Sequence, residues 1–328
     1  MRETMNPDAS TAARYRAFAE VEARGMSATY EAWATGVAED AATIALIEEL
    51  PVAKRQPNLV FSAARFRGAP LGAYPELRDW LHRHWGEVRA TVRDHATQTN
   101  EAGRCALHLP VLAGLPGPLA LLEVGASAGL CLYPDRYAYR YDGGAPLQPA
   151  DGPSPVQLEC ETAGGVPLPA ALPEVVWRAG IDLHPLDVTR ADDLAWLDAL
   201  IWPEHEDRRA RLRAAASLVA AEPPRLVTGD LVEQLGRVAA EAPAEATLVV
   251  LHTAVIAYLD ASARRRFVDE VTKLNGHWLS VEGRGVVPGI AAREDRPNES
   301  SDFVLALDGE QLAWVQPHGR AIRWVGTP

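Results

Sequence analysis

The stretch of this chain with the most chemical content is residues 119–130, LALLEVGASAGL. Its first half, Leu119 to Val124, is apolar and typical of a buried strand, and its second half is a turn of small residues from Gly125 to Gly129. A strand that leads through such a turn into a helix presents main-chain N–H groups and a helix N-terminus to a ligand. We therefore expect ligand chemistry at this turn.

The spacing of the turn fits a nucleophile elbow, in which a serine on a tight turn after a strand attacks an ester or amide. Gly125-x-Ser127-x-Gly129 has the required pattern. Residues able to complete a catalytic triad lie later in the chain: Asp230, with His252 or His318. A nucleophile elbow normally follows several strands and pairs with a glycine-rich oxyanion loop. The sequence before the turn predicts neither, so the serine hydrolase is an alternative interpretation.

Two further interpretations of the turn are open. A dinucleotide fingerprint requires G-x-G-x-x-G, and counting from Gly125 its third glycine position holds Leu130. A leucine side chain there opposes close packing of helix on strand, so the match to a nicotinamide or flavin site fails. The other interpretation is a strand–turn–helix corner that binds no ligand.

The secondary-structure elements that position this turn differ between the two parts of the chain, before and after residue 118. Residues 1–117 predict helices, because Pro57 and Pro75 suit first helical positions and Ser27 suits an N-cap. A further helix is expected over Asn100 to Leu112. No strand is predicted in this region.

From residue 118 onwards, apolar runs of strand length alternate with helical segments. The predicted strands are Leu119–Val124, Val175–Ile181, Arg225–Thr228, Thr247–Leu251 and Trp278–Val281. The predicted helices are Asp192–Leu200, Asp207–Ala221, Leu231–Ala240 and Ser262–Asn275. Such alternation is typical of the α/β class, in which helices cover both faces of a parallel sheet.

The end of the chain has a different pattern. Phe303–Leu307 and Gln311–Val315 flank an Asp-Gly pair that suits a tight primed hairpin turn, and Ala321–Val325 follows as a last strand. Residues 142–173 are rich in glycine and proline and predict an inserted loop or ribbon. We therefore expect a helical region over residues 1–117 and one α/β domain over residues 118–328.

Composition narrows the classes of function. Of the 328 residues, 48% are hydrophobic and 23% are charged, as in ordinary globular proteins. The net charge of −12 argues against a broad nucleic-acid-binding surface. No apolar run reaches the roughly 18 residues of a membrane span, and the N-terminus lacks a signal-peptide core. We expect a cytoplasmic protein with no membrane partner, whose three separated cysteines form neither a disulfide framework nor a zinc site.

The fuller spacing Glu123-x-Gly125-x-Ser127-x-Gly129 resembles motif I of the class I S-adenosylmethionine-dependent methyltransferases, usually (D/E)-x-G-x-G-x-G. Ser127 replaces the middle glycine of that motif. The resemblance implies a Rossmann-like methyltransferase sheet, mostly parallel with an antiparallel C-terminal hairpin, and S-adenosylmethionine as the cofactor. It also implies that these four residues lie against the cofactor.

The same resemblance implies roles for carboxylates that follow later strands. Asp182, in RAGIDLHP, would face the ribose hydroxyls, with Asp142 as a rival nearer the usual spacing. Asp230, in RLVTGDL, resembles the acidic residue beside the adenine. From the residues alone, each of these aspartates can instead be a helix N-cap or a turn residue.

Two other segments supply candidate residues. Asn100 and Arg104 belong to the polar stretch TQTNEAGR, which could descend over the cofactor and place Arg104 on its carboxylate. A capped helix start is the alternative for this stretch. His252 follows the strand TLVVL, where such methyltransferases often place groups that contact the substrate, and a histidine suits proton removal near neutrality. A hydrogen-bonded histidine at a strand end is the alternative for His252.

Longer segments, among them RQPNLVFSA, TQTNEAGRC, GIDLHPLDV and LVVLHTAV, look like a bacterial family of unknown function placed in the methyltransferase-like Rossmann group. The sequence therefore predicts transfer of a methyl group from S-adenosylmethionine to an unidentified small-molecule acceptor. The alternatives are a non-catalytic cofactor-binding or interaction module on the same fold and a serine hydrolase.

Overall fold

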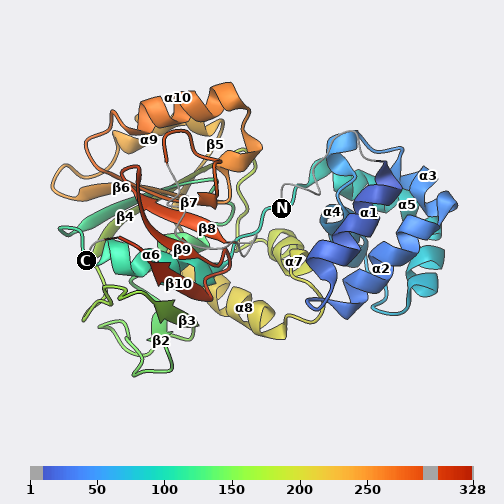
Figure 1. The fold of residues 1–328 in the computed structure, drawn as a ribbon, viewed down its shortest axis with the longest axis horizontal. Helices are drawn as coiled ribbons and strands as arrows, with labels where there is room; N and C mark the ends of the chain where they lie inside the picture. Colours follow the sequence, from blue (N-terminus) through green and yellow to red (C-terminus); the bar gives the residue numbers. More distant parts are fainter. Residues whose placement is uncertain (1–9, 291–301, 327–328) are drawn as a thin grey trace. The chain divides into compact units, whose positions relative to one another are not determined.

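The computed structural model describes residues 10–290 and 302–326, and within them the chain forms two compact units (Figure 1). The helical unit comprises the residues up to Thr99 together with Arg190–Ala210. The sheet unit comprises Asn100–Thr189 and the residues from Arg211 on. This division differs from the predicted boundary at residue 117, because the chain enters the sheet unit earlier and returns once to the helical unit.

The described part of the helical unit contains helices and no strand, as the sequence predicts. Its elements are α1 Thr11–Ala17, the π-helical η2 Phe18–Ala23, α2 Ala28–Glu39, α3 Ala41–Ile47, η3 Val52–Lys54, α4 Pro57–Phe66, α5 Tyr74–Asp94, α7 Ala191–Leu200 and the start of α8 Glu206–Ala221. Ser27 caps α2, since its hydroxyl accepts a hydrogen bond from the Tyr30 N–H at 3.0 Å. Pro57 is the first residue of α4, as expected.

Contacts from Trp202 explain why Arg190–Ala210 belongs with helices far earlier in the sequence. The Trp202 ring packs edge-on against Phe18 with ring centroids 5.7 Å apart. Its indole N–H donates to Asn58 Oδ1 at 2.8 Å. Local periodicity cannot reveal such pairings, because they join residues more than 140 positions apart.

The sheet unit is a mixed α/β structure. Its strands are β1 Leu119–Val124, β2 Ala138–Tyr141, β3 Gln157–Ala163, β4 Val175–Asp182, β5 Arg225–Thr228, β6 Thr247–Thr253, β7 His277–Gly283, β8 Phe303–Leu307, β9 Glu310–Val315 and β10 Ala321–Trp324. Its helical elements are η4 Ala102–Arg104, α6 Cys105–Leu112, η5 Leu130–Leu132, the remainder of α8, α9 Leu231–Ala239, η6 Ile256–Tyr258 and α10 Ala261–Val271. Within the described residues the strands build a ten-stranded sheet in the order β2-β3-β10-β9-β8-β7-β6-β1-β4-β5.

The centre of the sheet is parallel, as the alternation of strands and helices predicts. Neighbouring strands β7, β6, β1, β4 and β5 all run parallel, and β8 and β9 add antiparallel strands beyond β7. The turn between β8 and β9 has φ values of 50° at Asp308 and 88° at Gly309, the positive values that a primed turn requires. Every predicted strand is present, which confirms the α/β class. Strands β2 and β3 are additional to the prediction.

Helices cover both faces of the parallel strands (Figure 1). On one face α9 and α10 share a hydrophobic core with Leu122 of β1 and Val250 of β6, which are partners in register. On the other face lies α6, all of whose residues are buried. Because side chains alternate along a strand, Glu123 faces the α6 side, whereas His252 faces α10.

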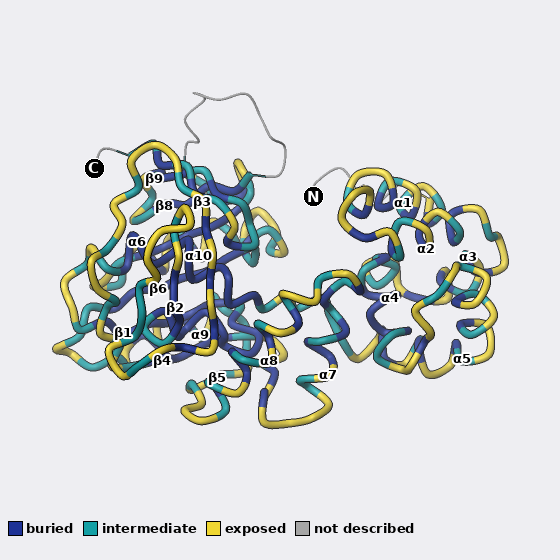
Figure 2. Tube along the Cα trace, turned by 90° about the horizontal axis from the view of Figure 1, so that it is seen from below, coloured by how far each residue is buried: buried dark blue, intermediate teal, exposed yellow. Residues whose placement is uncertain are grey.

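The small-residue turn does not lead into an α-helix, contrary to the prediction. Strand β1 is buried throughout (Figure 2), and the turn that follows it ends in η5, a three-residue 3₁₀ segment. Pro134 follows shortly after, and a proline disfavours the helical conformation of the residue before it. Tyr133, the residue before it, accordingly has φ −118° and ψ 44°. The turn therefore has no helix N-terminus to offer a ligand.

Among the helices of residues 10–290 and 302–326, none is both long and apolar enough to cross a membrane.

Candidate functional site

The Gly125–Gly129 turn lies at the carboxyl edge of the parallel strands. Its φ values are 72° at Gly125, 51° at Ser127 and 72° at Gly129, so the backbone is left-handed at three positions. Two of these carry glycine, which adopts such values without strain. A Cβ on Gly125 would overlap the side chain of Val255, which follows β6. The turn is therefore closed on this side by the chain itself.

The main-chain N–H groups of the turn bind acceptors within the protein. Gly125 and Ala126 both donate to Ile181 O, Ser127 donates to Asp182 Oδ2 at 2.9 Å, Gly129 donates to Ala126 O at 2.7 Å, and Leu130 donates to Asn100 Oδ1 at 2.9 Å. The prediction that these amides form a cradle open to a ligand is therefore wrong. The carbonyl of Ile181, a carbonyl within the turn and two side-chain oxygens accept these hydrogen bonds instead.

Of the three predicted aspartates, only Asp182 lies at the turn. It ends β4, beside β1, and its two oxygens accept hydrogen bonds from the N–H groups of Ser127 and His184, each at 2.9 Å. These two bonds fix the orientation of the carboxylate at the carboxyl edge. This placement comes from the pairing of β4 with β1, which the spacing of the sequence alone does not reveal.

Of the other two aspartates, Asp142 lies apart from the turn, whereas Asp230 follows Gly229, whose N–H donates to Asp182 O at 2.9 Å. Asp142 follows β2, at the opposite end of the strand order from β5, and accepts from the Thr162 N–H at 2.6 Å. Asp230 caps α9 and accepts from the Val232 N–H at 2.8 Å. Asp142 is therefore not brought to Asp182, and Asp230 has the N-cap position that the sequence left open as an alternative.

Glu123 is the most incompletely bonded carboxyl at this edge. It is 3% exposed, and within residues 10–290 and 302–326 its Oε2 atom has no hydrogen-bond partner. Burial raises the pKa of Glu123 well above its usual range, the neighbouring Cys131 adds to that rise, and Arg104 opposes it. The carboxyl thus lies in a site that favours its neutral form until a cation approaches.

Asn100 and Arg104 both lie at this edge, and their predicted contact with a cofactor stays a prediction. Asn100 Nδ2 donates to Ala126 O at 3.2 Å, and Asn100 Oδ1 accepts from the Leu130 N–H. This one side chain therefore binds main chain within the turn and directly after it. Arg104 donates to Thr253 O at 3.3 Å and to Pro317 O at 3.2 Å. The predicted helix over residues 100–112 begins only at η4, because Glu101 is extended and caps it.

His252 does not have the role of proton acceptor that the sequence suggests. It is fully buried, its Nδ1 lies 3.0 Å from Glu282 Oε1, and the Trp278 indole N–H donates to its Nε2 at 3.0 Å. Since an indole nitrogen can only donate, Nε2 is the acceptor and Nδ1–H donates to Glu282. Both ring nitrogens are engaged, on the face opposite Glu123, so the alternative of a hydrogen-bonded strand-end histidine applies.

His108 is a buried polar residue that sequence reasoning missed. Its Nε2 lies 3.1 Å from Thr253 Oγ1, and in the described part of the chain its Nδ1 has no partner. Burial lowers the pKa of His108 to about 3, with Arg104 and His252 contributing, so the ring is neutral at physiological pH. The available signal was a single histidine within the apolar run CALHLPVL.

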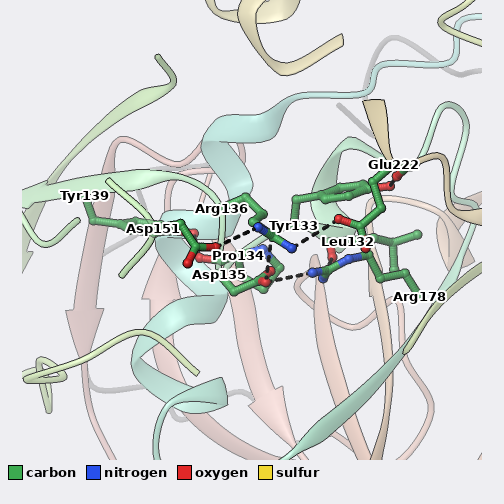
Figure 3. A network of polar contacts seen from close by, with 9 residues as sticks. All are labelled: Leu132, Tyr133, Pro134, Asp135, Arg136, Tyr139, Asp151, Arg178 and Glu222. Atoms are coloured by element: carbon green, nitrogen blue, oxygen red, sulfur yellow. Dashed lines mark hydrogen bonds and ion pairs between the residues drawn. The ribbon is translucent and has the colours of Figure 1, made fainter. Parts of the chain in front are cut away.

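A charged network anchors the segment that follows the turn (Figure 3). Arg178 on β4 donates to Leu132 O at 2.6 Å and to Asp135 Oδ2 at 2.7 Å, and its guanidinium lies 4.7 Å from the centroid of the Tyr133 ring. Burial raises the pKa of Asp135, while Arg178 opposes the rise. Arg136 extends the network to the surface. We interpret this network as support for the turn, because its charges are paired with one another.

The hydrolase interpretation has little geometric support. Ser127 is 3% exposed, whereas a nucleophile elbow exposes its hydroxyl to substrate. His252, one of the two histidines considered for the triad, has no ring nitrogen left for a serine within the described residues. Nor does any group of three or more His, Cys, Asp or Glu side chains there form a possible metal site.

The fold and the turn define an α/β protein with a buried polar cluster at the carboxyl edge of a mostly parallel sheet. The chain belongs to the family described as "Uncharacterized protein conserved in bacteria (DUF2332)", which matches residues 12–324. No curated protein and no solved structure is significantly similar to it. The family match confirms the resemblance to a bacterial family of unknown function, and the resemblance to methyltransferases stays a prediction.

Proposed function

We propose that the sheet unit binds S-adenosylmethionine at the carboxyl ends of β1 and β4 and transfers its methyl group to a small-molecule acceptor. The observation that carries the proposal is Glu123, whose buried Oε2 lacks a partner among the described residues and whose pKa is raised by burial. A buried carboxyl of this kind gains most from a ligand ammonium group, because the pair satisfies both charges out of water. The amino group of the cofactor is such a cation.

The order of the parallel strands supports a Rossmann-like assignment. Numbered along the chain, the five strands β1, β4, β5, β6 and β7 lie in the order 3-2-1-4-5 across the sheet. This is the order of a doubly wound sheet, whose ligands bind outside the carboxyl ends of the strands where the order reverses. Here the reversal falls between β1 and β6, and the turn with Glu123 lies at the end of β1.

Two residues fit complementary parts of the cofactor. Glu123 would hold the amino group, and Asp182, oriented by two main-chain N–H groups, would hold the ribose hydroxyls. When bound, S-adenosylmethionine supplies a methyl group already activated on a sulfonium. The protein then has to orient the donor against the acceptor and exclude water, which the burial of this edge favours.

A binding module without catalysis is the second candidate, and the engagement of both His252 ring nitrogens favours it. We assign no general base to the site for the same reason. Binding is common to both candidates, so it is the property to test first. We propose a cytoplasmic location for either.

Isothermal titration with S-adenosylhomocysteine tests the proposal. We expect wild-type protein to bind it, and Asp182→Ala to weaken binding by about tenfold or more, as for loss of a hydrogen bond to a charged group. Asp142→Ala is the matched control, since it removes a strand-end aspartate remote from the turn. Failure of the wild-type protein to bind at millimolar ligand would refute the proposal.

A second ligand separates the role of Glu123 from a general loss of structure. Methylthioadenosine carries the same nucleoside but no ammonium group. Glu123→Gln should lower the affinity for S-adenosylhomocysteine about tenfold or more. The affinity of the same variant for methylthioadenosine should be unchanged. Equal losses for both ligands would remove Glu123 from ammonium recognition.

A further inference from the structure

Helix α6 buries one imidazole among apolar side chains. Its sequence, CALHLPVL, is apolar apart from His108, which is 1% exposed. His108 Nε2 lies 3.1 Å from Thr253 Oγ1, and in the described part of the chain Nδ1 has no hydrogen-bond partner. A buried polar atom without a partner costs free energy that a bound ligand recovers. His108 Nδ1 is therefore a candidate for ligand contact that the proposed function has not used.

His108 and Glu123 belong to the same face of the sheet. Glu123 on β1 is in register with Leu251 on β6, and Thr253 lies two residues further along β6. Side chains alternate along a strand, so Glu123 and Thr253 both face α6, where His108 contacts Thr253. The strand order reverses between β1 and β6, where doubly wound sheets bind ligands. The two buried atoms without partners, Glu123 Oε2 and His108 Nδ1, thus belong to the two sides of this reversal.

The two atoms differ in the ligand charge that they favour. Burial, followed by the charge of Arg104 one helical turn earlier, lowers the pKa of His108 to about 3. The ring is therefore neutral and lies in the positive potential of a guanidinium, which favours an anion beside it. Burial raises the pKa of Glu123, and Asp182 adds to that rise although Arg104 opposes it. The carboxyl of Glu123 accordingly gains most from a cation.

Hydrogen bonding at the ring is compatible with an anionic ligand. A threonine hydroxyl can donate as well as accept. When Thr253 donates to Nε2, the ring proton of His108 is on Nδ1, where it can be donated to a carboxylate oxygen. Arg104 itself donates to Thr253 O at 3.3 Å and to Pro317 O at 3.2 Å. Its guanidinium is thus held by main chain close to the ring, and it contributes positive charge there.

We propose that His108 recognises the carboxylate of the ligand whose ammonium group binds Glu123. The inference rests on the proposed function, because it assumes that Glu123 holds that ammonium group. It makes His108 the residue that selects an intact amino-acid group, with its ammonium and its carboxylate, over a decarboxylated one. The resemblance to methyltransferases gives the carboxylate to Arg104, whereas here Arg104 acts through its charge and His108 makes the contact. A free amino acid carries the same group, so the experiment has to separate the two sources.

Two amide substitutions distinguish the two ring nitrogens. In His108→Gln the amide extends about as far from the main chain as Nε2, so it keeps a partner for Thr253 and removes Nδ1. In His108→Asn the amide extends only about as far as Nδ1, so it keeps a donor for the carboxylate. His277→Gln is the matched control, because His277 begins β7 at the other edge of the sheet.

Isothermal titration with two ligands tests the proposal. S-adenosylhomocysteine carries both the ammonium and the carboxylate, whereas an aminopropyl thioether of adenosine keeps the nucleoside and the ammonium and lacks the carboxylate. His108→Gln should lower the affinity for S-adenosylhomocysteine about tenfold or more, as for loss of a hydrogen bond to a charged group. Its affinity for the thioether should be unchanged. His108→Asn should keep most of the affinity for S-adenosylhomocysteine, and His277→Gln should change neither affinity.

The outcomes separate this inference from the proposed function. If His108→Gln binds S-adenosylhomocysteine as tightly as wild type, or loses equal affinity for both ligands, the inference is overturned and the proposed function stands. If wild type binds no S-adenosylhomocysteine, the proposed function is refuted, and titration with free methionine decides the inference. Binding of methionine that His108→Gln weakens supports an amino-acid site without the nucleoside. Absence of methionine binding overturns the inference as well.

Discussion

The two faces of the central sheet use buried carboxyl groups in opposite ways. On the α9 and α10 face, Glu282 Oε1 accepts hydrogen bonds from His252 Nδ1 at 3.0 Å and from the main-chain N–H groups of Val255 and Ile256 at 2.8 Å. On the α6 face, Glu123 Oε2 has no partner in the described residues. Glu123 lies near the end of β1 and Glu282 near the end of β7, the two strands on either side of β6, and neither side chain is more than 3% exposed.

The difference teaches that burial alone does not mark a ligand site. Glu282 Oε2 also lacks a partner within the described chain, yet the three donors on Oε1 fix the carboxyl as a support for the loop after β6. Glu123 has no such set of main-chain donors among the described hydrogen bonds, and its pKa is raised by burial. A buried carboxyl without main-chain donors is a candidate for ligand recognition, whereas one that accepts several hydrogen bonds from its own chain is structural.

The largest effect should come from removing the structural carboxyl. Glu282→Ala leaves three donors without their acceptor, two of them buried, and each unsatisfied buried donor costs about 1–3 kcal/mol. We expect a loss of about 3–5 kcal/mol in the free energy of unfolding, measured by urea denaturation. Glu282→Gln keeps a carbonyl acceptor at the same place and should lose much less. A loss below about 1 kcal/mol for the alanine variant would contradict the structural role.

A smaller loss of stability should follow from adding a side chain where the turn after β1 contacts the segment after β6. Gly125→Ala places a Cβ at φ 72° and against Val255, so left-handed strain and overpacking both act. We expect destabilisation of about 2–4 kcal/mol, measured by thermal and urea unfolding. Gly143→Ala, at φ 69° with open space around its Cβ, isolates the strain and should cost about 1–2 kcal/mol. Equal costs for the two variants would mean that Val255 yields freely.

The effect that is smallest at each pH unit is a dependence of stability on pH, which arises from Glu123 on the α6 face. Glu123 has a raised pKa in the folded protein, so the folded state holds its proton at pH values where the unfolded state has lost it. Stability therefore falls as pH rises above about 4.5, by up to about 1.4 kcal/mol per pH unit, until the folded group ionises. Glu123→Gln removes this contribution.

Unfolding free energies of wild type and Glu123→Gln, compared from pH 4 to pH 8, measure the contribution. The variant should gain stability relative to wild type as pH rises. The groups that act on Glu123, namely Arg104, Cys131 and Asp182, are present in both proteins, and so is His108, whose pKa is lowered by burial. A difference that does not change with pH would show that Glu123 ionises normally.

Local chemistry was enough to predict the elements of the sheet unit. Apolar runs of strand length gave Leu119–Val124, Arg225–Thr228 and Phe303–Leu307 with the bounds observed. The Asp-Gly turn between β8 and β9 was predictable because its positive φ values suit those two residue types. The sequence also contains the residue that stops a helix after the turn, Pro134, which the prediction of a helix there did not take into account.

The composition of the candidate site was less predictable, because it depends on which strands are neighbours and on their register. Glu123 and His252 both follow strand-like runs, but the pairing of Leu122 with Val250 places them on opposite faces. Asp182 reaches the turn because β4 pairs with β1, and Asp142 does not because β2 lies at the far edge.

The sequence by itself therefore determined the α/β class, the strands and the position of the small-residue turn, since periodicity and turn chemistry act over a few residues. Only the tertiary structure decided which polar groups share a face, which amides the protein occupies itself, and that Asn100 binds the turn. Side chains alternate at every residue of a strand, so a single step in register exchanges the two faces of the sheet.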